Sequence, residues 1–202
     1  MKAHILIFLI ILSQLFNCIG DKNPLEPSDI YSSKYFPLKV GNTWYYDKPT
    51  PQSNPWAVKM IRDFTKIKDK TYYIWTYGEG VGVYDTIRAD KFGRILKYIN
   101  GKEYLWFDFT QQNDSTYRFD YPEILGDKVY YFLVHVMRNR ICETPTGTFE
   151  NCIVLLFDIP EVVDEERGYT FAPDIGVVRI SFDGWSDSKL TSAVINGSII
   201  AE

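Results

Sequence analysis

Short apolar and aromatic runs, separated every few residues by turn-forming residues, dominate this sequence. Two examples are "YYIWTY" (Tyr72–Tyr77), followed by "GEGVG", and "RILKYI" (Arg94–Ile99), followed by "NGK". Runs of this length bounded by Gly, Asn and Asp are typical of β-strands joined by tight turns. No stretch beyond the N-terminal segment shows the apolar period of an amphipathic helix. Since aromatic residues, which favour strands, reach 16%, the sequence predicts an all-β domain.

The spacing of the expected strands predicts one antiparallel sheet. The Asn100-Gly101 pair is the strongest hairpin signal and joins Arg94–Ile99 to Tyr104–Phe109 as antiparallel neighbours. Sequential hairpins build a barrel, a half-barrel or a sandwich, and we expect a single sheet closed or strongly curved as a barrel or half-barrel. The other expected strands are Ala57–Phe64, Tyr72–Tyr77, Gly82–Arg88, Thr116–Phe119, Tyr130–Glu143, Thr148–Ile159, Gly176–Phe182 and Lys189–Asn196.

The N-terminus has the layout of a secretory signal peptide. Lys2 supplies a basic start, and Ile5–Leu12 is an unbroken apolar run of eight residues. This run is too short to cross a membrane as a helix. We expect residues 1–17 to be a signal peptide, residues 18–34 a flexible tether containing Pro24 and Pro27, and residues 35–202 a single β domain.

Cys18 closes the segment Leu15-Phe16-Asn17-Cys18, which resembles a bacterial lipobox. The resemblance implies that the cysteine carries a diacylglycerol and, after cleavage before it, an amide-linked chain such as palmitate. Several acyl chains together hold a protein stably on a membrane. We therefore expect an exported protein, lipid-anchored at the bacterial cell envelope, and Ile19 permits the outer membrane. The alternative is an ordinary signal peptide with an incidental cysteine.

A long hairpin is expected around "CETPTGTFENC" (Cys142–Cys152). Pro145 suits the second position of a turn, and Gly147 suits the left-handed conformation that closes a three-residue loop. This loop predicts that Thr144 pairs with Thr148.

The register of that hairpin bears on a disulfide between Cys142 and Cys152. With the three-residue loop, Cys142 faces Glu150 and Cys152 faces Arg140, so the cysteines are diagonal neighbours at about 7–8 Å. A disulfide requires Cα atoms about 4.4–6.8 Å apart, which a register one residue longer would supply. Export to an oxidising compartment favours the bond. The sequence leaves both the disulfide and two buried free thiols open.

Three segments resemble a group of largely uncharacterised bacterial envelope proteins, many of them lipoproteins. They are "YFPLKVGNTWYYD" (Tyr35–Asp47), "ETPTGTFENCIVL" (Glu143–Leu155) and "FAPDIGVVRI" (Phe171–Ile180), and "EYLWFDF" (Glu103–Phe109) is similar to a middle segment of the group. The resemblance implies an envelope location and a β-rich fold, and brings no catalytic residue. From the residues themselves, we expect a turn at Gly41 followed by a strand that contains Trp44.

Candidate catalytic and metal-binding residues are few. His135 is the only histidine beyond the expected signal peptide, and its place between two valines indicates a sheet residue and not a member of a catalytic triad. No zinc, redox, phosphate or dinucleotide motif occurs, so no cofactor is expected. Glu161, Asp164, Glu165 and Glu166 form an acidic loop whose spacing differs from that of an EF-hand.

We interpret the net charge of the chain as excluding a nucleic-acid partner. The formal net charge is −4, and it becomes −5 without residues 1–17, which contain Lys2 and no acidic residue. A mildly acidic chain without a basic cluster lacks the electrostatic footprint that nucleic acid requires.

Aromatic rows on two strands provide a binding hypothesis. Side chains two residues apart share a strand face and can line a ligand cavity or pack as core. The candidate residues are Tyr73, Trp75, Tyr77, Tyr104 and Trp106.

We therefore expect a non-enzymatic binding or interaction module, attached to a membrane by its lipid and contacting an envelope protein or an apolar small molecule. One alternative is a carrier of lipid or another apolar ligand, which requires an apolar cavity. A carboxylate-based hydrolase is the least favoured alternative, since it requires two carboxylates about 5–10 Å apart in a cleft.

Overall fold

The computed structural model describes residues 33–47, 57–78, 82–125, 128–160, 162–163, 166–182 and 186–201. All of them belong to one compact unit, Tyr31–Glu202. The expected signal peptide, Cys18 and most of the expected tether lie outside these residues. Within the described ranges, no helix is long and apolar enough to span a membrane.

The described chain is all-β, as the sequence predicted. Its strands are β1 (Thr43–Tyr46), β2 (Val58–Ile67), β3 (Lys70–Tyr77), β4 (Tyr84–Ala89), β5 (Ile95–Ile99), β6 (Lys102–Phe107), β7 (Ser115–Leu125), β8 (Lys128–Thr144), β9 (Gly147–Asp158), β10 (Arg167–Ala172), β11 (Gly176–Phe182), β12 (Ser186–Ile195) and β13 (Ser198–Ile200).

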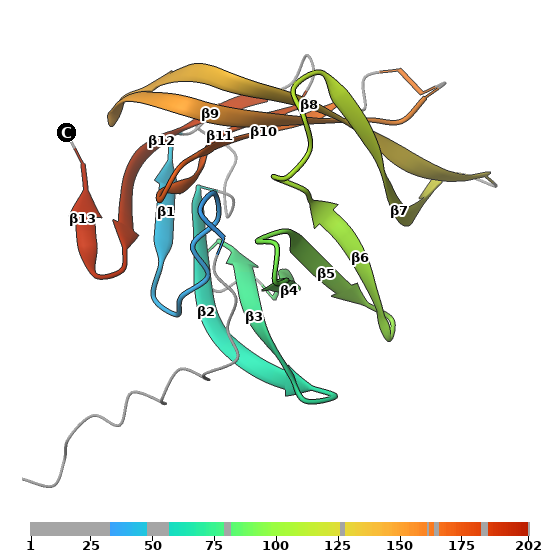
Figure 1. The fold of residues 1–202 in the computed structure, drawn as a ribbon. Coiled ribbons are helices and arrows are strands. Elements are labelled where there is room, and N and C mark those ends of the chain that lie inside the picture. The colour runs from blue at the N-terminus through green and yellow to red at the C-terminus, as the bar shows by residue number, and fades with distance from the viewer. Residues whose placement is uncertain are drawn as a thin grey trace, which may run out of the picture. The chain divides into compact units, whose positions relative to one another are not determined.

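These strands form one antiparallel sheet that is nearly closed into a barrel (Figure 1). The order is β6-β5-β4-β3-β2-β1-β12-β11-β10-β9-β8-β7, with β13 added on β12. The sheet thus consists of two meanders of sequential hairpins, β1–β6 and β7–β12, joined by the pairing of β1 with β12. This confirms the expected curved single sheet, and it excludes the two-sheet sandwich.

Ten expected strands correspond to strands of the structure, and the expected Asn100-Gly101 hairpin is present, with Ile99 opposite Lys102. The strands β10 and β13 were missed, and β1 was expected only as the strand that contains Trp44.

The strand β10 has a local reason for being missed. It is short, contains Gly168 and follows directly after the acidic loop, so it lacks the uninterrupted apolar run that marks the other strands.

The interior of the sheet is filled largely by aromatic rings. Phe36, which precedes β1, is fully buried and its ring centroid lies 5.0–6.0 Å from those of Trp44, Trp75, Phe107 and Phe171. These rings come from strands on both meanders, so Phe36 ties the two halves of the sheet together. Burial of such side chains is the main stabilising contribution to a core.

Trp44 also fixes the turn between β10 and β11. Its indole Nε1 donates a hydrogen bond to the carbonyl of Ile175 at 2.7 Å. Gly176, at φ +98°, lies so close that an added Cβ would stand 3.0 Å from the indole ring. The strand β1 begins at Thr43 and contains Trp44. This agrees with the expectation that a strand containing Trp44 follows the Gly41 turn.

The β8–β9 hairpin differs from its expected register. Thr144 pairs with Gly147 and not with Thr148, so the loop contains two residues instead of three. The expected Cys142–Glu150 pair is therefore wrong, and Cys142 lies opposite Phe149.

Bulges further along the hairpin restore part of the expected register. Asn139 and Asn151 both adopt φ of 54°, next to the interruptions in the ladder. A bulge shifts the count between two strands by one residue. Cys152 consequently lies opposite Arg140, as predicted.

Candidate functional site

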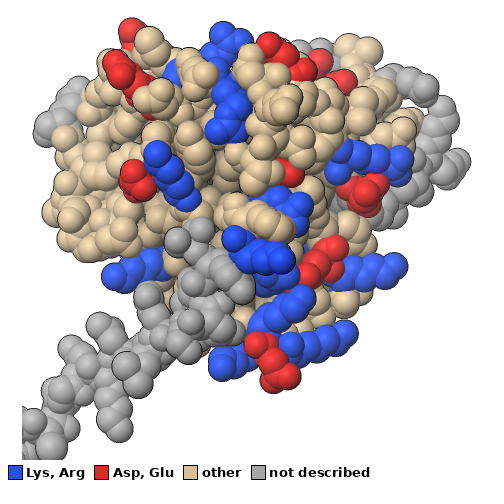
Figure 2. Space-filling model, viewed as in Figure 1, with Lys and Arg blue, Asp and Glu red and all other residues tan. Residues whose placement is uncertain are grey.

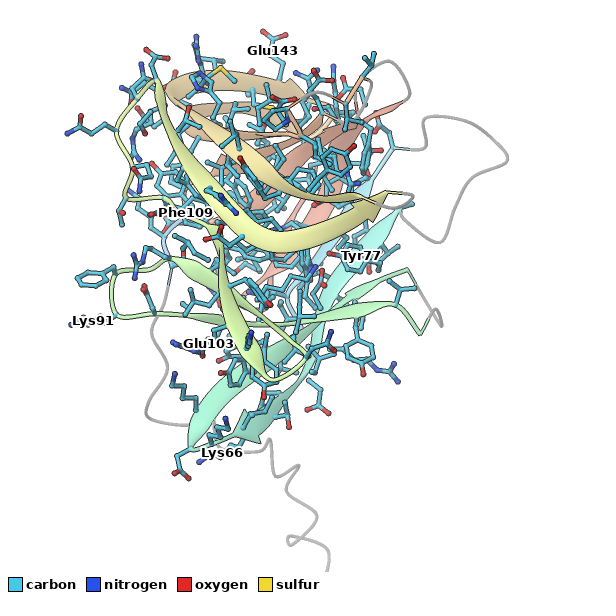
Figure 3. The ribbon with its side chains drawn as sticks, turned by 90° about the vertical axis from the view of Figure 1, so that its right-hand side faces the viewer. Lys66, Tyr77, Lys91, Glu103, Phe109 and Glu143 are labelled. Carbon is cyan, nitrogen blue, oxygen red and sulfur yellow. The ribbon has the colours of Figure 1, made fainter. Side chains whose placement is uncertain are left out.

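The sheet has two ends, which we call the Tyr77 end and the Phe109 end (Figure 3). Because neighbouring strands alternate in direction, β1, β3, β5, β7, β9 and β11 end, and β2, β4, β6, β8, β10 and β12 begin, at the Tyr77 end. Connections that cluster at one end of a barrel-like sheet are where such folds commonly bind ligands.

The aromatic candidates from the sequence lie mainly in the interior. Tyr73, Trp75, Tyr77 and Trp106 are buried, whereas Tyr104 is half-buried. The ring centroid of Trp75 lies 5.1 Å from that of Tyr77 and 5.5 Å from that of Trp106. Four of the five candidates therefore pack as core at this level of the sheet.

A group of polar side chains lies beside these rings near the Tyr77 end. We call Lys59, Tyr77, Asp85 and Lys97 the polar layer. They come from the four adjacent strands β2, β3, β4 and β5. The Tyr77 hydroxyl donates a hydrogen bond to Asp85, and Lys97 Nζ lies 2.6 Å from Asp85 Oδ1.

Aromatic faces hold both ammonium groups of the polar layer. Lys59 Nζ lies 3.9 Å from the ring centroid of Tyr77 and 5.1 Å from that of Trp75. Lys97 Nζ lies 4.5 Å from the ring centroid of Trp106. Cations placed over aromatic faces at these distances are stabilised by the ring quadrupole.

Burial strongly affects protonation in this layer. Lys59 is only 5% exposed, and its burial lowers the pKa of its ammonium group to about 7, although Asp85 partly offsets this. Burial raises the pKa of Tyr77 well above its ordinary value, and the charge of Asp85 adds to the effect. Lys59 therefore changes its protonation state much closer to neutral pH than an exposed lysine does.

Two further tyrosines approach the layer from other strands. Tyr46 of β1 is buried and donates its hydroxyl to the carbonyl of Val177 at 2.8 Å. Tyr169 of β10 has a pKa raised to about 12, first by burial and second by the charge of Asp85. Both phenols stay neutral at physiological pH, so the lysines and Asp85 carry the layer's charge.

The described part of the layer lacks the pair of carboxylates that a hydrolase of the expected kind requires. Asp85 is the one carboxylate among the four residues that define it, and its charge is paired with Lys97. Among the described residues, no group of three or more His, Cys, Asp and Glu side chains is placed to hold a metal ion.

A second charged cluster consists of Lys70, Tyr72, Arg88 and Glu103. Arg88 pairs with Glu103 through Nε–Oε1 and Nη2–Oε2 distances of 2.6 and 2.9 Å, and Lys70 Nζ lies 3.1 Å from Oε2. These hydrogen bonds, Arg88 first, lower the pKa of Glu103 to about 2. Both carboxylate oxygens of Glu103 are thus occupied by partners from neighbouring strands. We therefore interpret the cluster as a structural link between the strands.

The remaining sequence candidates are spread over the molecule. Cys142 and Cys152 are free and buried in the β8–β9 hairpin. His135 is half-buried, with Nδ1 3.4 Å from the Thr116 hydroxyl. Of the acidic loop, only Glu166 lies among the described residues. Over the face drawn in Figure 2, acidic and basic side chains lie among one another, with more Lys and Arg in its lower part.

Sequence reasoning missed Lys59, Asp85 and Lys97. Each occupies a strand position two residues from a buried isoleucine, namely Ile61, Ile87 and Ile95. A charged residue at an apolar-face position, repeated in neighbouring strands, was the available signal.

Comparison of this chain with protein-family models, with curated proteins and with solved structures finds no match. The resemblance to envelope lipoproteins thus stays a prediction from the motifs. What the fold defines is an all-β protein with one nearly closed antiparallel sheet.

Proposed function

We propose that this chain is an exported, lipid-anchored protein of the bacterial cell envelope, and that its β domain is a non-enzymatic binding module acting through the Tyr77 end of the sheet. The observation that carries the binding role is the polar layer. Lys59 and Asp85 are buried in an otherwise aromatic interior at that end.

Stability alone gives little reason for buried charges at this position. Removing two charges from water costs several kcal/mol per ion, and well-packed apolar residues of similar volume are often as stabilising or more so. Lys59, with its lowered pKa, bears such a cost. A ligand or partner that contacts the layer supplies a reason for keeping it.

The packing of the aromatic candidates favours this proposal over an apolar carrier. Trp106 stacks on Phe107 with a centroid distance of 4.1 Å, and Trp75 contacts Trp106 and Phe36. These side chains occupy the interior that a carrier would need for its cargo, which supports binding at the end of the sheet.

Site-specific photo-crosslinking in the producing cells tests where the module binds. A photoreactive phenylalanine analogue replaces Tyr84, which is 58% exposed at the start of β4 and opposite Thr76. The matched control replaces Phe92, which is 60% exposed in the β4–β5 turn at the Phe109 end. We expect one discrete adduct from position 84 and none from position 92. Identical adduct patterns at both positions would contradict the proposal.

The anchor is tested separately by Cys18→Ala. We expect the wild-type chain to carry the mass of its acyl groups and to partition into membranes, and the variant to lose both properties. Cys142→Ser is the matched control, since it changes a cysteine inside the domain and leaves the anchor intact. An unchanged mass and membrane fraction for Cys18→Ala would remove the lipid anchor from the proposal.

A further inference from the structure

We propose that the domain docks on an anionic lipid bilayer through two neighbouring turns at the Phe109 end, and that Phe92 inserts at the boundary between head groups and acyl chains. The two turns are residues 66–70, between β2 and β3, and residues 90–94, between β4 and β5. We call them the basic tips. This inference rests on the proposed attachment to a membrane, and it adds a contact that the lipid anchor alone does not provide.

The basic tips are neighbours in the sheet. The strand β3, which follows one tip, pairs with β4, which leads into the other. Glu103 joins them further, because Lys70 of the first tip and Arg88, just before the second, both bind its carboxylate, at 3.1 and 2.6 Å. In Figure 3, Lys66 and Lys91 lie on the same side of the molecule, away from the Tyr77 end. A single flat surface can therefore contact both tips.

The basic tips concentrate positive charge in an acidic chain. They contain five basic and two acidic residues, a formal net charge of +3, whereas the whole chain carries −4. Two of the basic side chains form ion pairs, Lys70 with Glu103 and Arg94 with Asp90. The other three are exposed, namely Lys66, Lys68 and Lys91. Anionic head groups attract basic side chains that lie close to a bilayer, so the charge of the tips complements such a surface.

Phe92 is held at the surface by its own turn. It is 60% exposed, and the backbone N–H groups of Phe92 and Arg94 donate to Asp90 Oδ1 at 2.9 and 3.0 Å. Arg94 Nε also donates to Asp90 Oδ2 at 2.7 Å. The Asp90 carboxylate therefore fixes the turn, and insertion of the ring requires little further ordering of the backbone.

Cations flank the exposed ring of Phe92. Lys91 Nζ lies 4.9 Å from the ring centroid, and the guanidinium carbon of Arg94 lies 5.2 Å from it. This arrangement suits a membrane interface, where an apolar side chain enters the acyl boundary while basic groups stay among the phosphates. One exposed aromatic residue alone is ordinary on a protein surface. Its combination with the exposed lysines of both tips indicates a lipid surface.

Docking through the basic tips orients the domain. The Phe109 end faces the bilayer, and the Tyr77 end, through which we propose binding, points away from it. The expected tether, residues 18–34, spans roughly 20–25 Å as a flexible chain. It would therefore keep the tips at a high local concentration near the bilayer. A side chain surrounded by lipid meets no protein, which agrees with the use of position 92 as the crosslinking control.

Quenching of tryptophan fluorescence by brominated lipids tests the contact. The full chain, purified in detergent, is added to preformed vesicles of phosphatidylethanolamine with phosphatidylglycerol, or of phosphatidylcholine alone, with bromine near the head-group end of the acyl chains. In Phe92→Trp we expect more quenching than in the wild type in the anionic vesicles only. Tyr84→Trp is the matched control, since Tyr84 is 58% exposed at the Tyr77 end, and should add no quenching. No added quenching at position 92, equal quenching at position 84, or equal quenching in phosphatidylcholine would overturn the proposal.

Charge variants of the Phe92→Trp chain assign the effect to the lysines. The tip variant combines Lys66→Gln, Lys68→Gln and Lys91→Gln. We expect it to lose the added quenching, because its tips no longer attract the anionic head groups. The control changes the net charge equally at three exposed arginines of the second meander, namely Arg118→Gln, Arg140→Gln and Arg179→Gln, and should keep the quenching. Unchanged quenching in the tip variant would overturn the proposal.

Salt provides a second measurement, which decides if the tip variant fails to fold. At about 1 M salt the Debye length is about 3 Å, so attraction between exposed lysines and lipid head groups is screened. We expect the added quenching in Phe92→Trp to be lost under these conditions. Its persistence would overturn the proposal.

The crosslinking experiment separates this inference from the proposed function. A discrete protein adduct at position 92 would indicate a protein partner at the basic tips and overturn docking on lipid. Absence of quenching at position 92, together with a discrete adduct at position 84, would overturn the docking and leave the binding module standing. Quenching at position 92 without any adduct at position 84 would support the docking and overturn the proposed binding through the Tyr77 end.

Discussion

Tyr117 of β7 donates its hydroxyl to the backbone carbonyl of Trp106 in β6 at 2.7 Å, and the same oxygen accepts the backbone N–H of Asp108 at 3.1 Å. These strands are the two edges of the sheet, and their described residues form no ladder with each other. The half-buried Tyr117 side chain bridges this seam and satisfies backbone groups that a neighbouring strand would otherwise pair.

Replacing Tyr117 with phenylalanine should open the seam. The substitution leaves a buried carbonyl and a buried N–H without this partner, and we expect the free energy of unfolding to fall by about 1–3 kcal/mol. Denaturant unfolding measures the loss, and hydrogen exchange should become faster in residues 102–107. Tyr98→Phe is the control, because the described residues offer its hydroxyl no hydrogen bond; equal effects of the two changes would refute the bridging role.

Glu103→Gln should weaken the cluster that joins β3, β4 and β6. The pKa of Glu103 is lowered to about 2, so its carboxylate contributes stability above its unfolded pKa of about 4.3 that is lost as the pH falls toward 2. We expect a loss of about 1–2 kcal/mol at pH 7, reduced by partial exposure, and a flatter pH dependence between about pH 4 and pH 2. Glu150→Gln, at an exposed position, should change neither property in thermal unfolding.

Lys59→Met should stabilise the domain at neutral and lower pH. The pKa of Lys59 is about 7 in the folded state and about 10.4 in the unfolded state. The unfolded state therefore binds more protons between these values, and the stability of the wild type should rise with pH by up to about 1.4 kcal/mol per unit. The variant should lack this rise between about pH 7.5 and pH 9 in urea titrations. A wild type with a flat profile would show that Lys59 is not buried as described.

Cys142 and Cys152, which are free in the structure, should form a disulfide under oxidising conditions. Burial raises the pKa of the Cys152 thiol to about 11, and the Cys142 thiol and the Cys142 N–H both lie close enough to affect that pKa. After oxidation the domain should lose two hydrogens, about 2 Da, and resist alkylation until reduced. Alkylation of both cysteines in oxidant-treated, unreduced and unfolded protein would rule the bond out, and Cys142→Ser controls for the reagent.

Most of the fold was predictable because its determinants are local. Alternating apolar residues and turn pairs such as Asn100-Gly101 mark hairpins whose partners are adjacent in the chain. The β8–β9 register was not predictable, since it depends on bulges at Asn139 and Asn151. Both residues have positive φ angles, which are determined by tertiary packing and not by the local sequence. Two asparagines in a strand are a weak signal for this conformation.

The polar layer was harder to predict than any strand. Lys59, Asp85 and Lys97 come together only through the registers of three strand pairs. Charged residues in short strands normally indicate a solvated face, and the aromatic pattern drew attention to Trp75 and Trp106 instead. The aromatic candidates did lie beside the layer, so the sequence identified the region and not the charges in it.

The pairing of β1 with β12 has a consequence for the timing of biosynthesis. Thr43 lies opposite Val194, so nearly the whole domain must be synthesised between two residues that pair directly. At about 5–20 residues per second, this separation corresponds to a delay on the order of ten seconds. Throughout that delay one edge of β1 has no native partner, which gives a nascent chain of this topology a period in which a chaperone or the export machinery can still hold it unfolded.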